Sequence, residues 1–135
     1  DPQAKLDALS SALTATIHSV EDLGHKVLLV QTVPSWGEPF PLRWEQCSLI
    51  KVSMNGCRRN MQTDSLPGRQ NEVAKVISSV AAATGTPVVD LAPELCPAGV
   101  CRNVTKRGFV VYRDSTHVTV DQSKALSGVF LQAMR

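Results

Sequence analysis

The sequence predicts an α/β fold in which helices alternate with short buried strands to form a three-layer α/β/α sheet. Apolar residues recur at helical spacing in three segments, and two of these segments are each followed by a short apolar run rich in β-branched residues. The chain has 135 residues and is 43% hydrophobic, so we expect a single domain over residues 1–135 with one buried core.

The first helix is expected over residues 4–23, and Gly24 ends it. Its apolar residues at spacings of three and four are Leu6, Leu9, Leu13, Ile17 and Val20. Residues 26–33 are almost continuously apolar, which is typical of a parallel strand covered on both faces, and Pro34 stops the run. A long loop is expected over residues 35–67, with room for a short element in residues 47–54.

A second helix is expected over residues 70–83, and Gly85 closes it. Its apolar residues at helical spacing are Val73, Val76, Ile77 and Val80. Residues 87–91 then supply a second short apolar strand that contains Asp90. The helix–strand unit therefore occurs twice, which is the basis of the predicted sheet.

The C-terminal third predicts a hairpin followed by a helix. Two β-rich segments between residues 100 and 112 flank Lys106-Arg107-Gly108, a typical turn sequence. Thr119 and Gln122 have the spacing of a capping box at the start of a final amphipathic helix. The apolar residues of that helix are Leu126, Val129, Phe130 and Met134.

Four cysteines, at positions 47, 57, 96 and 101, predict disulfides. Three pairings are possible, and Cys47–Cys57 with Cys96–Cys101 closes the shortest loops, each worth ~2–3 kcal/mol. Disulfides imply an oxidising compartment. The alternative is a zinc site, but nine and four residues separate the cysteines of the two pairs, unlike the two-residue spacing of a zinc ribbon. No Cys-x-x-Cys redox motif is present, and we expect no metal and no cofactor.

Charge and hydropathy exclude two classes of partner. The chain carries 14 Lys and Arg against 12 Asp and Glu, a net charge of +2 with no basic stripe, so we expect no nucleic-acid partner. The apolar runs are too short to cross a bilayer. No signal segment is visible at Asp1, which we expect to be a mature terminus or an internal cut.

Asp114 and His117 are the candidate catalytic residues. A histidine three residues after an aspartate, in a loop before a helix, can fold back so that the carboxylate meets one imidazole nitrogen while the other faces a cleft. This is the geometry of the Asp–His pair in a Ser-His-Asp triad, where the carboxylate fixes the tautomer and stabilises the imidazolium. The alternative is that Asp114, Ser115 and Thr116 are ordinary turn residues and His117 is a surface side chain.

The C-terminal stretch VVYRDSTHVTVDQSKAL resembles the last catalytic block of the SGNH hydrolase superfamily, particularly the domains fused to acyltransferase-3 type membrane acyltransferases. In those domains a Tyr-Arg-Asp-x-x-His block follows a cysteine-bounded segment like residues 95–101, which follows a strand like Val88-Val89-Asp90. Residues 27–34 are similar to a strand that leads into a proline-containing loop, and Cys47 with Cys57 to an extra cysteine pair. The resemblance covers most of the chain.

The resemblance implies a flavodoxin-like (SGNH hydrolase) sheet and a serine esterase mechanism, in which Asp114 orients His117 and His117 activates a serine. The nucleophile of the family lies in a Gly-Asp-Ser block after the first strand, and this sequence contains no Gly-Asp-Ser. The glycine and asparagine that form the oxyanion hole in the family cannot be assigned to residues of this sequence either. Ser35, Ser65 and Ser115 do not stand at a sharp strand-to-helix turn. We therefore expect the chain to be the C-terminal part of such a domain, without its N-terminal strand; the alternative is a loss of catalysis.

The resemblance also implies the substrate and location. We expect a bacterial, extracytoplasmic O-acyltransferase domain that transfers a short, acetyl-like acyl group on a cell-envelope glycan, with a membrane acyltransferase domain in the same protein. Trp36 and Trp44 are expected to line an acyl or glycan pocket, or else to anchor the core or the loop. The alternatives are a secreted carbohydrate esterase and a catalytically inactive glycan-binding module. Residues 103–105 match a glycosylation sequon, which is usually incidental in bacteria.

Overall fold

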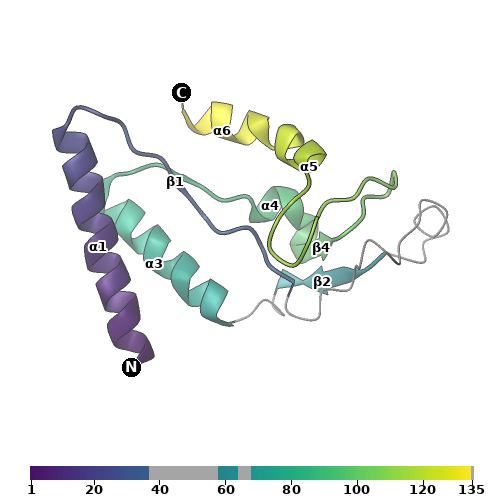
Figure 1. Ribbon diagram of the computed structural model, residues 1–135, viewed down its shortest axis with the longest axis horizontal. Coiled ribbons are helices and arrows are strands. Elements are labelled where there is room, and N and C mark those ends of the chain that lie inside the picture. The colour runs from purple at the N-terminus through teal and green to yellow at the C-terminus, as the bar shows by residue number, and fades with distance from the viewer. Residues whose placement is uncertain (37–57, 64–67, 135) are drawn as a thin grey trace. The chain divides into compact units, whose positions relative to one another are not determined.

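The computed structural model describes residues 1–36, 58–63 and 68–134 (Figure 1). The chain divides into two units. Unit 1 comprises Asp1–Thr32, Gly68–Asp90 and Val129–Arg135, and unit 2 comprises Val33–Pro67 and Leu91–Gly128. The single domain expected over residues 1–135 stays a prediction, and each unit is described by itself.

Unit 1 begins with helix α1, Pro2–Asp22, close to the predicted residues 4–23. The Asp1 carboxylate caps the helix by accepting from the Gln3 N–H at 2.9 Å, and Pro2 occupies the first turn, where its missing N–H has no cost. Gly24, with φ +83°, follows the end of the helix as predicted. Ile17, only 1% exposed, is the buried centre of the apolar face.

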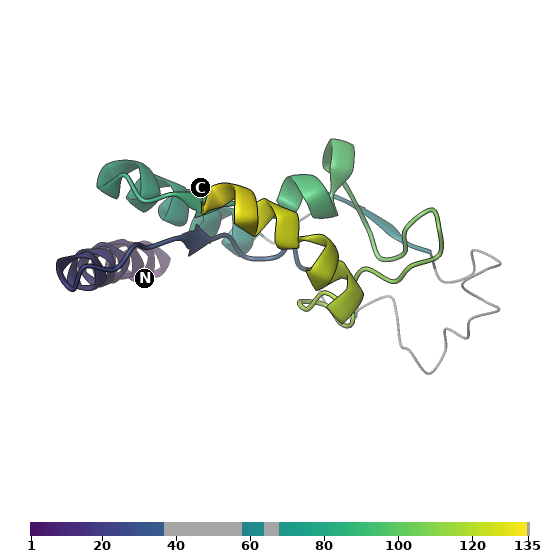
Figure 2. The ribbon, with the colours of Figure 1, turned by 90° about the horizontal axis from the view of Figure 1, so that it is seen from above.

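Helix α3, Gly68–Thr84, confirms the second predicted helix and packs against α1. The two helices lie side by side in both views (Figure 1 and Figure 2). Val80 and Ala81 are buried, and Gly85, with φ +72°, ends the helix as predicted. The helical spacing in the sequence thus identifies the face that packs.

Strands β1, Leu29–Val30, and β3, Val88–Val89, form a parallel pair in unit 1. Leu29 lies opposite Val88, and the Leu29 N–H donates to the Pro87 carbonyl at 2.9 Å. The Gln31 N–H continues the ladder by donating to the Val89 carbonyl at 2.8 Å. Helices with a parallel strand pair define the α/β class.

The predicted strands 26–33 and 87–91 were wrong in length and in burial. Each is two residues long, and Val30 and Val88 are 43% and 38% exposed rather than covered on both faces. Complete coverage requires helices on both faces of a wider sheet, and among the described residues the parallel sheet has only this pair.

Unit 2 contains an antiparallel pair formed by β2, Asn60–Gln62, and β4, Val100–Arg102, with Met61 opposite Cys101. Helix α4, Ala92–Leu95, and the 3₁₀ turn η3, Pro97–Gly99, precede β4. The predicted Cys96–Cys101 disulfide is confirmed and closes the loop that contains η3. Cys47, Cys57 and the possible element in residues 47–54 lie outside the described residues.

The hairpin predicted around Lys106-Arg107-Gly108 is confirmed in unit 2. Val104 and Val110 form an antiparallel bridge, and the Thr105 N–H donates to the Phe109 carbonyl at 2.7 Å. Gly108 has φ +85°, a conformation that glycine adopts without steric cost. A second bridge, between Tyr112 and Val118, follows this hairpin and flanks the Asp114–His117 turn.

The single final helix predicted from the sequence was wrong, because it is interrupted at Leu126. Helix α5 spans Val120–Ala125 and helix α6 spans Ser127–Ala133. Thr119 caps α5, as predicted, by accepting from the Gln122 N–H at 3.3 Å. Ser127 and Gly128 follow the break, and such a pair is a common cause of helix kinks.

Candidate active site

The Asp114–His117 segment is a tight turn held at its base by backbone hydrogen bonds. Tyr112 and Val118 are bridged across the base, and the Arg113 N–H donates to the His117 carbonyl at 2.8 Å. Within the turn, Asp114 Oδ1 accepts from the Thr116 N–H at 2.9 Å and the His117 N–H at 2.8 Å. This is an Asx turn, in which an aspartate satisfies the N–H groups that follow it.

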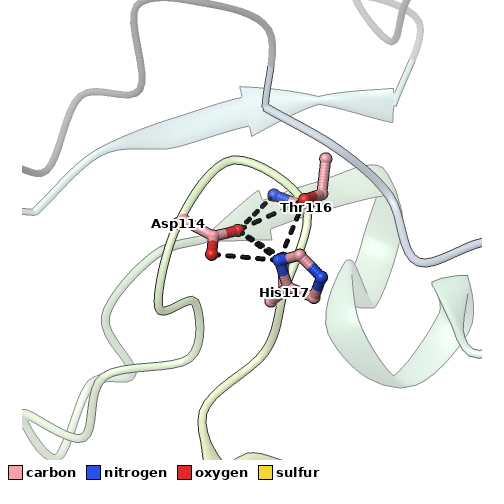
Figure 3. A network of polar contacts seen from close by, with 3 residues as sticks. All are labelled: Asp114, Thr116 and His117. Carbon is pink, nitrogen blue, oxygen red and sulfur yellow. Dashed lines mark hydrogen bonds and ion pairs between the residues drawn. The ribbon is translucent and has the colours of Figure 1, made fainter.

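The two candidate catalytic side chains meet on one side of this turn, as the sequence predicts. His117 Nδ1 lies 2.9 Å from Asp114 Oδ1 and 3.0 Å from Oδ2. Figure 3 shows both contacts, with the second ring nitrogen, Nε2, directed away from the carboxylate. The histidine side chain is 73% exposed, so reagents from solution can reach it.

The electrostatics of the turn determine which ring nitrogen carries the proton. The Thr116 N–H lowers the pKa of Asp114 to about 2, with further contributions from the ring and backbone N–H of His117, while burial opposes the shift. The carboxylate is therefore ionised near neutral pH and can only accept hydrogen bonds. Both short contacts then require a proton on Nδ1, which leaves the Nε2 lone pair free to accept a proton.

Two buried aromatic residues are connected to the turn through the backbone. Trp36 and Tyr112 are 5% and 0% exposed and meet edge to face, with ring centroids 5.8 Å apart. Burial raises the pKa of Tyr112 to about 12, so the phenol stays neutral. The backbone N–H of Trp36 donates to the Ser115 carbonyl at 2.8 Å, which fixes the middle of the turn.

Thr119 fixes the residues that follow the turn. Its N–H donates to the Val111 carbonyl at 2.9 Å, and its hydroxyl donates to the Val110 carbonyl at 2.8 Å. Because Thr119 also caps α5, one residue joins the turn to both the hairpin and the helix.

Trp36 and Asn103, two other residues singled out in the sequence, are both buried. The burial of Trp36 favours the core-anchoring alternative, and contact between Trp36 and a substrate stays a prediction. Trp44 lies outside the described residues. Asn103 of the sequon is 0% exposed and its amide oxygen accepts from the Arg59 N–H at 2.8 Å, so the sequon is not accessible to a glycosylating enzyme.

An ordinary turn and an Asp114–His117 contact were alternatives in the sequence, whereas the structure contains both. The oxygen that forms the Asx turn also contacts His117, so the turn brings the two side chains together. Sequence reasoning missed the contacts that Thr116 makes with this pair. The spacing Asp-x-Thr is an Asx-turn signal that would have identified its N–H as a partner of Asp114.

A family model described as "SGNH domain (fused to AT3 domains)" matches residues 1–132. The chain therefore belongs to the family of SGNH domains that are fused to acyltransferase-3 domains, which confirms the resemblance and identifies a domain related to hydrolases and acyltransferases. No curated protein and no solved structure matches the chain. Within residues 1–36, 58–63 and 68–134, no helix is both long and apolar enough to cross a membrane.

Proposed function

We propose that the chain belongs to an O-acyltransferase or esterase that uses a Ser-His-Asp triad, with His117 as the general base and Asp114 as its orienting carboxylate. The observation that carries this proposal is the Asp114–His117 contact, in which Nδ1 meets both carboxylate oxygens and Nε2 is left exposed. Because the sequence contains no Gly-Asp-Ser, we infer that the nucleophilic serine comes from polypeptide outside these 135 residues.

The reaction then follows from the proton positions. Nε2 of His117 removes the proton of the serine hydroxyl as the serine oxygen attacks the acyl carbonyl, and Asp114 stabilises the imidazolium that forms. The imidazolium returns its proton to the leaving oxygen, and an acyl-enzyme results. Water or a sugar hydroxyl next attacks the acyl-enzyme, again assisted by Nε2, and the serine is regenerated.

Two further observations support the wider biological setting. The family is fused to acyltransferase-3 domains, which supports a membrane acyltransferase as the partner domain. The Cys96–Cys101 disulfide supports an oxidising, extracytoplasmic location. We propose a cell-envelope glycan as the substrate and a short, acetyl-like acyl group. We also propose that β1 and β3 belong to a three-layer, flavodoxin-like sheet, since their parallel pairing is the pattern such sheets require.

The absence of Gly-Asp-Ser also leaves a second function, a catalytically inactive glycan-binding module. A secreted carbohydrate esterase would share the chemistry but not the membrane domain. A serine at the position of the nucleophile in the full-length protein supports an enzyme, and any other residue there supports binding alone.

The direct test is His117→Ala in the full-length protein, assayed with a chromogenic acetyl ester. Removal of the general base is expected to lower turnover at least about a thousandfold, because the serine is then not activated. The matched control is His18→Ala, which removes an exposed histidine from α1 and should leave turnover unchanged. Thermal unfolding of both variants should stay close to wild type, since both side chains are exposed. Unchanged turnover in His117→Ala contradicts the proposal.

A further inference from the structure

We propose that Thr116 is a positioning residue for the Asp114–His117 pair, whose hydroxyl holds the proton on His117 Nδ1 and keeps Nε2 directed outward. Three contacts connect this threonine to the pair. Its N–H donates to Asp114 Oδ1 at 2.9 Å, and its hydroxyl oxygen lies 3.3 Å from the same oxygen and 3.1 Å from His117 Nδ1. The three residues form a closed triangle of polar contacts (Figure 3).

Only one assignment of donors and acceptors satisfies all the contacts among Asp114, Thr116 and His117. The ionised Asp114 carboxylate has no proton to give, so the Thr116 hydroxyl donates to it. The oxygen lone pairs of that hydroxyl are then available to accept from the Nδ1–H of His117. In the reverse direction the hydroxyl would donate to Nδ1, and an unprotonated Nδ1 would face a carboxylate oxygen 2.9 Å away, which is repulsive.

These contacts act on the imidazole ring of His117 and not on a substrate. Nδ1–H then has three acceptors, the two carboxylate oxygens and the hydroxyl, so both the tautomer and the orientation of the exposed imidazole are restricted. Because the imidazole is already oriented, its unprotonated Nε2 can accept the proton of the proposed nucleophilic serine without a change of ring position. The effect on turnover rests on the function proposed above, whereas the effect on the tautomer does not.

Kinetics of the full-length protein test the first effect. Thr116→Val removes the hydroxyl but keeps the side-chain shape and the backbone N–H, and we expect kcat for ester hydrolysis to fall about 3- to 10-fold with KM unchanged. Thr116→Ser should restore kcat to within about twofold of wild type, since it restores the hydroxyl. The control Thr16→Val removes an exposed α1 hydroxyl that donates to the Ala12 carbonyl at 2.8 Å and should leave kcat unchanged. Wild-type kcat in Thr116→Val overturns the proposal.

Nitrogen-15 NMR of the histidine rings tests the second effect. In protein labelled at histidine and held at an alkaline pH at which the ring shifts no longer change with pH, these shifts report the fraction with the proton on Nδ1. We expect Thr116→Val to lower this fraction for His117 but not for His18 and His25, which serve as internal references. An unchanged or higher fraction overturns the proposal. If the protein hydrolyses no ester at all, the proposed function fails, and the tautomer measurement still decides the role of Thr116.

Discussion

One oxygen atom, Asp114 Oδ1, connects the local fold of the turn to its chemistry. It accepts from the N–H groups of Thr116 and His117 and also meets His117 Nδ1. The same backbone N–H groups that form the turn therefore orient the carboxylate toward the imidazole. The pair is organised by residues next to it in the sequence and does not need a bound substrate to form.

The low pKa of Asp114 gives a pH-dependent prediction at the residue scale. The folded value of about 2 lies below the ordinary value of 3.8, chiefly because of the Thr116 N–H, so the contribution of this carboxylate to stability is complete above about pH 4. It is lost as the pH falls through 2. We expect carbon-13 NMR of the Asp114 carboxyl to titrate near pH 2, and the destabilisation of Asp114→Asn in urea to shrink between pH 5 and 2. A carboxyl midpoint near 4 contradicts the hydrogen bonding of the turn.

The sequence predicted the contact between Asp114 and His117 better than the residues that surround it. Asp114 and His117 lie three residues apart, so their contact follows from local turn geometry. Trp36 lies far from Tyr112 in the chain, and no local pattern reveals that their rings meet. Contacts between distant segments depend on the whole fold, which is why Trp36 was assigned to a pocket as readily as to the core.

At the scale of elements, helices were predicted closely and strands were not. The bounds of α1 and α3 agree with the predicted helices within two residues, because apolar spacing and end signals are local. The apolar runs around β1 and β3 indicated burial, but strand length is set by pairing with a partner. Strand β2, Asn60–Gln62, was not predicted, because its single apolar residue, Met61, is too short a pattern to identify a strand.

Two glycines offer a matched test of backbone conformation. A Cβ added at Gly128 or at Gly108 meets no atom within 4 Å, but only Gly108 has a positive φ, +85°. Gly128→Ala should therefore stabilise the protein by about 0.5 kcal/mol, because alanine favours the helix. Gly108→Ala should destabilise it by about 1 kcal/mol, because alanine is strained at positive φ. Urea unfolding measures both, and equal effects of the same sign would falsify this description of the hairpin and helix α6.

At the scale of the whole molecule, the candidate site belongs to one of the two units. Unit 2 contains Asp114, Thr116 and His117, the Trp36–Tyr112 pair and the Cys96–Cys101 disulfide. Unit 1 contains the parallel strands β1 and β3 with helices α1 and α3. The family match over residues 1–132 spans both units, which is why the resemblance was visible from sequence motifs drawn from each.

We propose that His117 activates a serine that these 135 residues do not supply. The most direct measurement is reaction of the full-length protein with a fluorophosphonate, which modifies only activated serines, followed by mass spectrometry of the peptides. We predict one modified serine in the wild-type protein and none in His117→Ala at the same exposure. Equal modification of both proteins, or no modification of the wild type, contradicts the assignment of Asp114 and His117 to a catalytic triad.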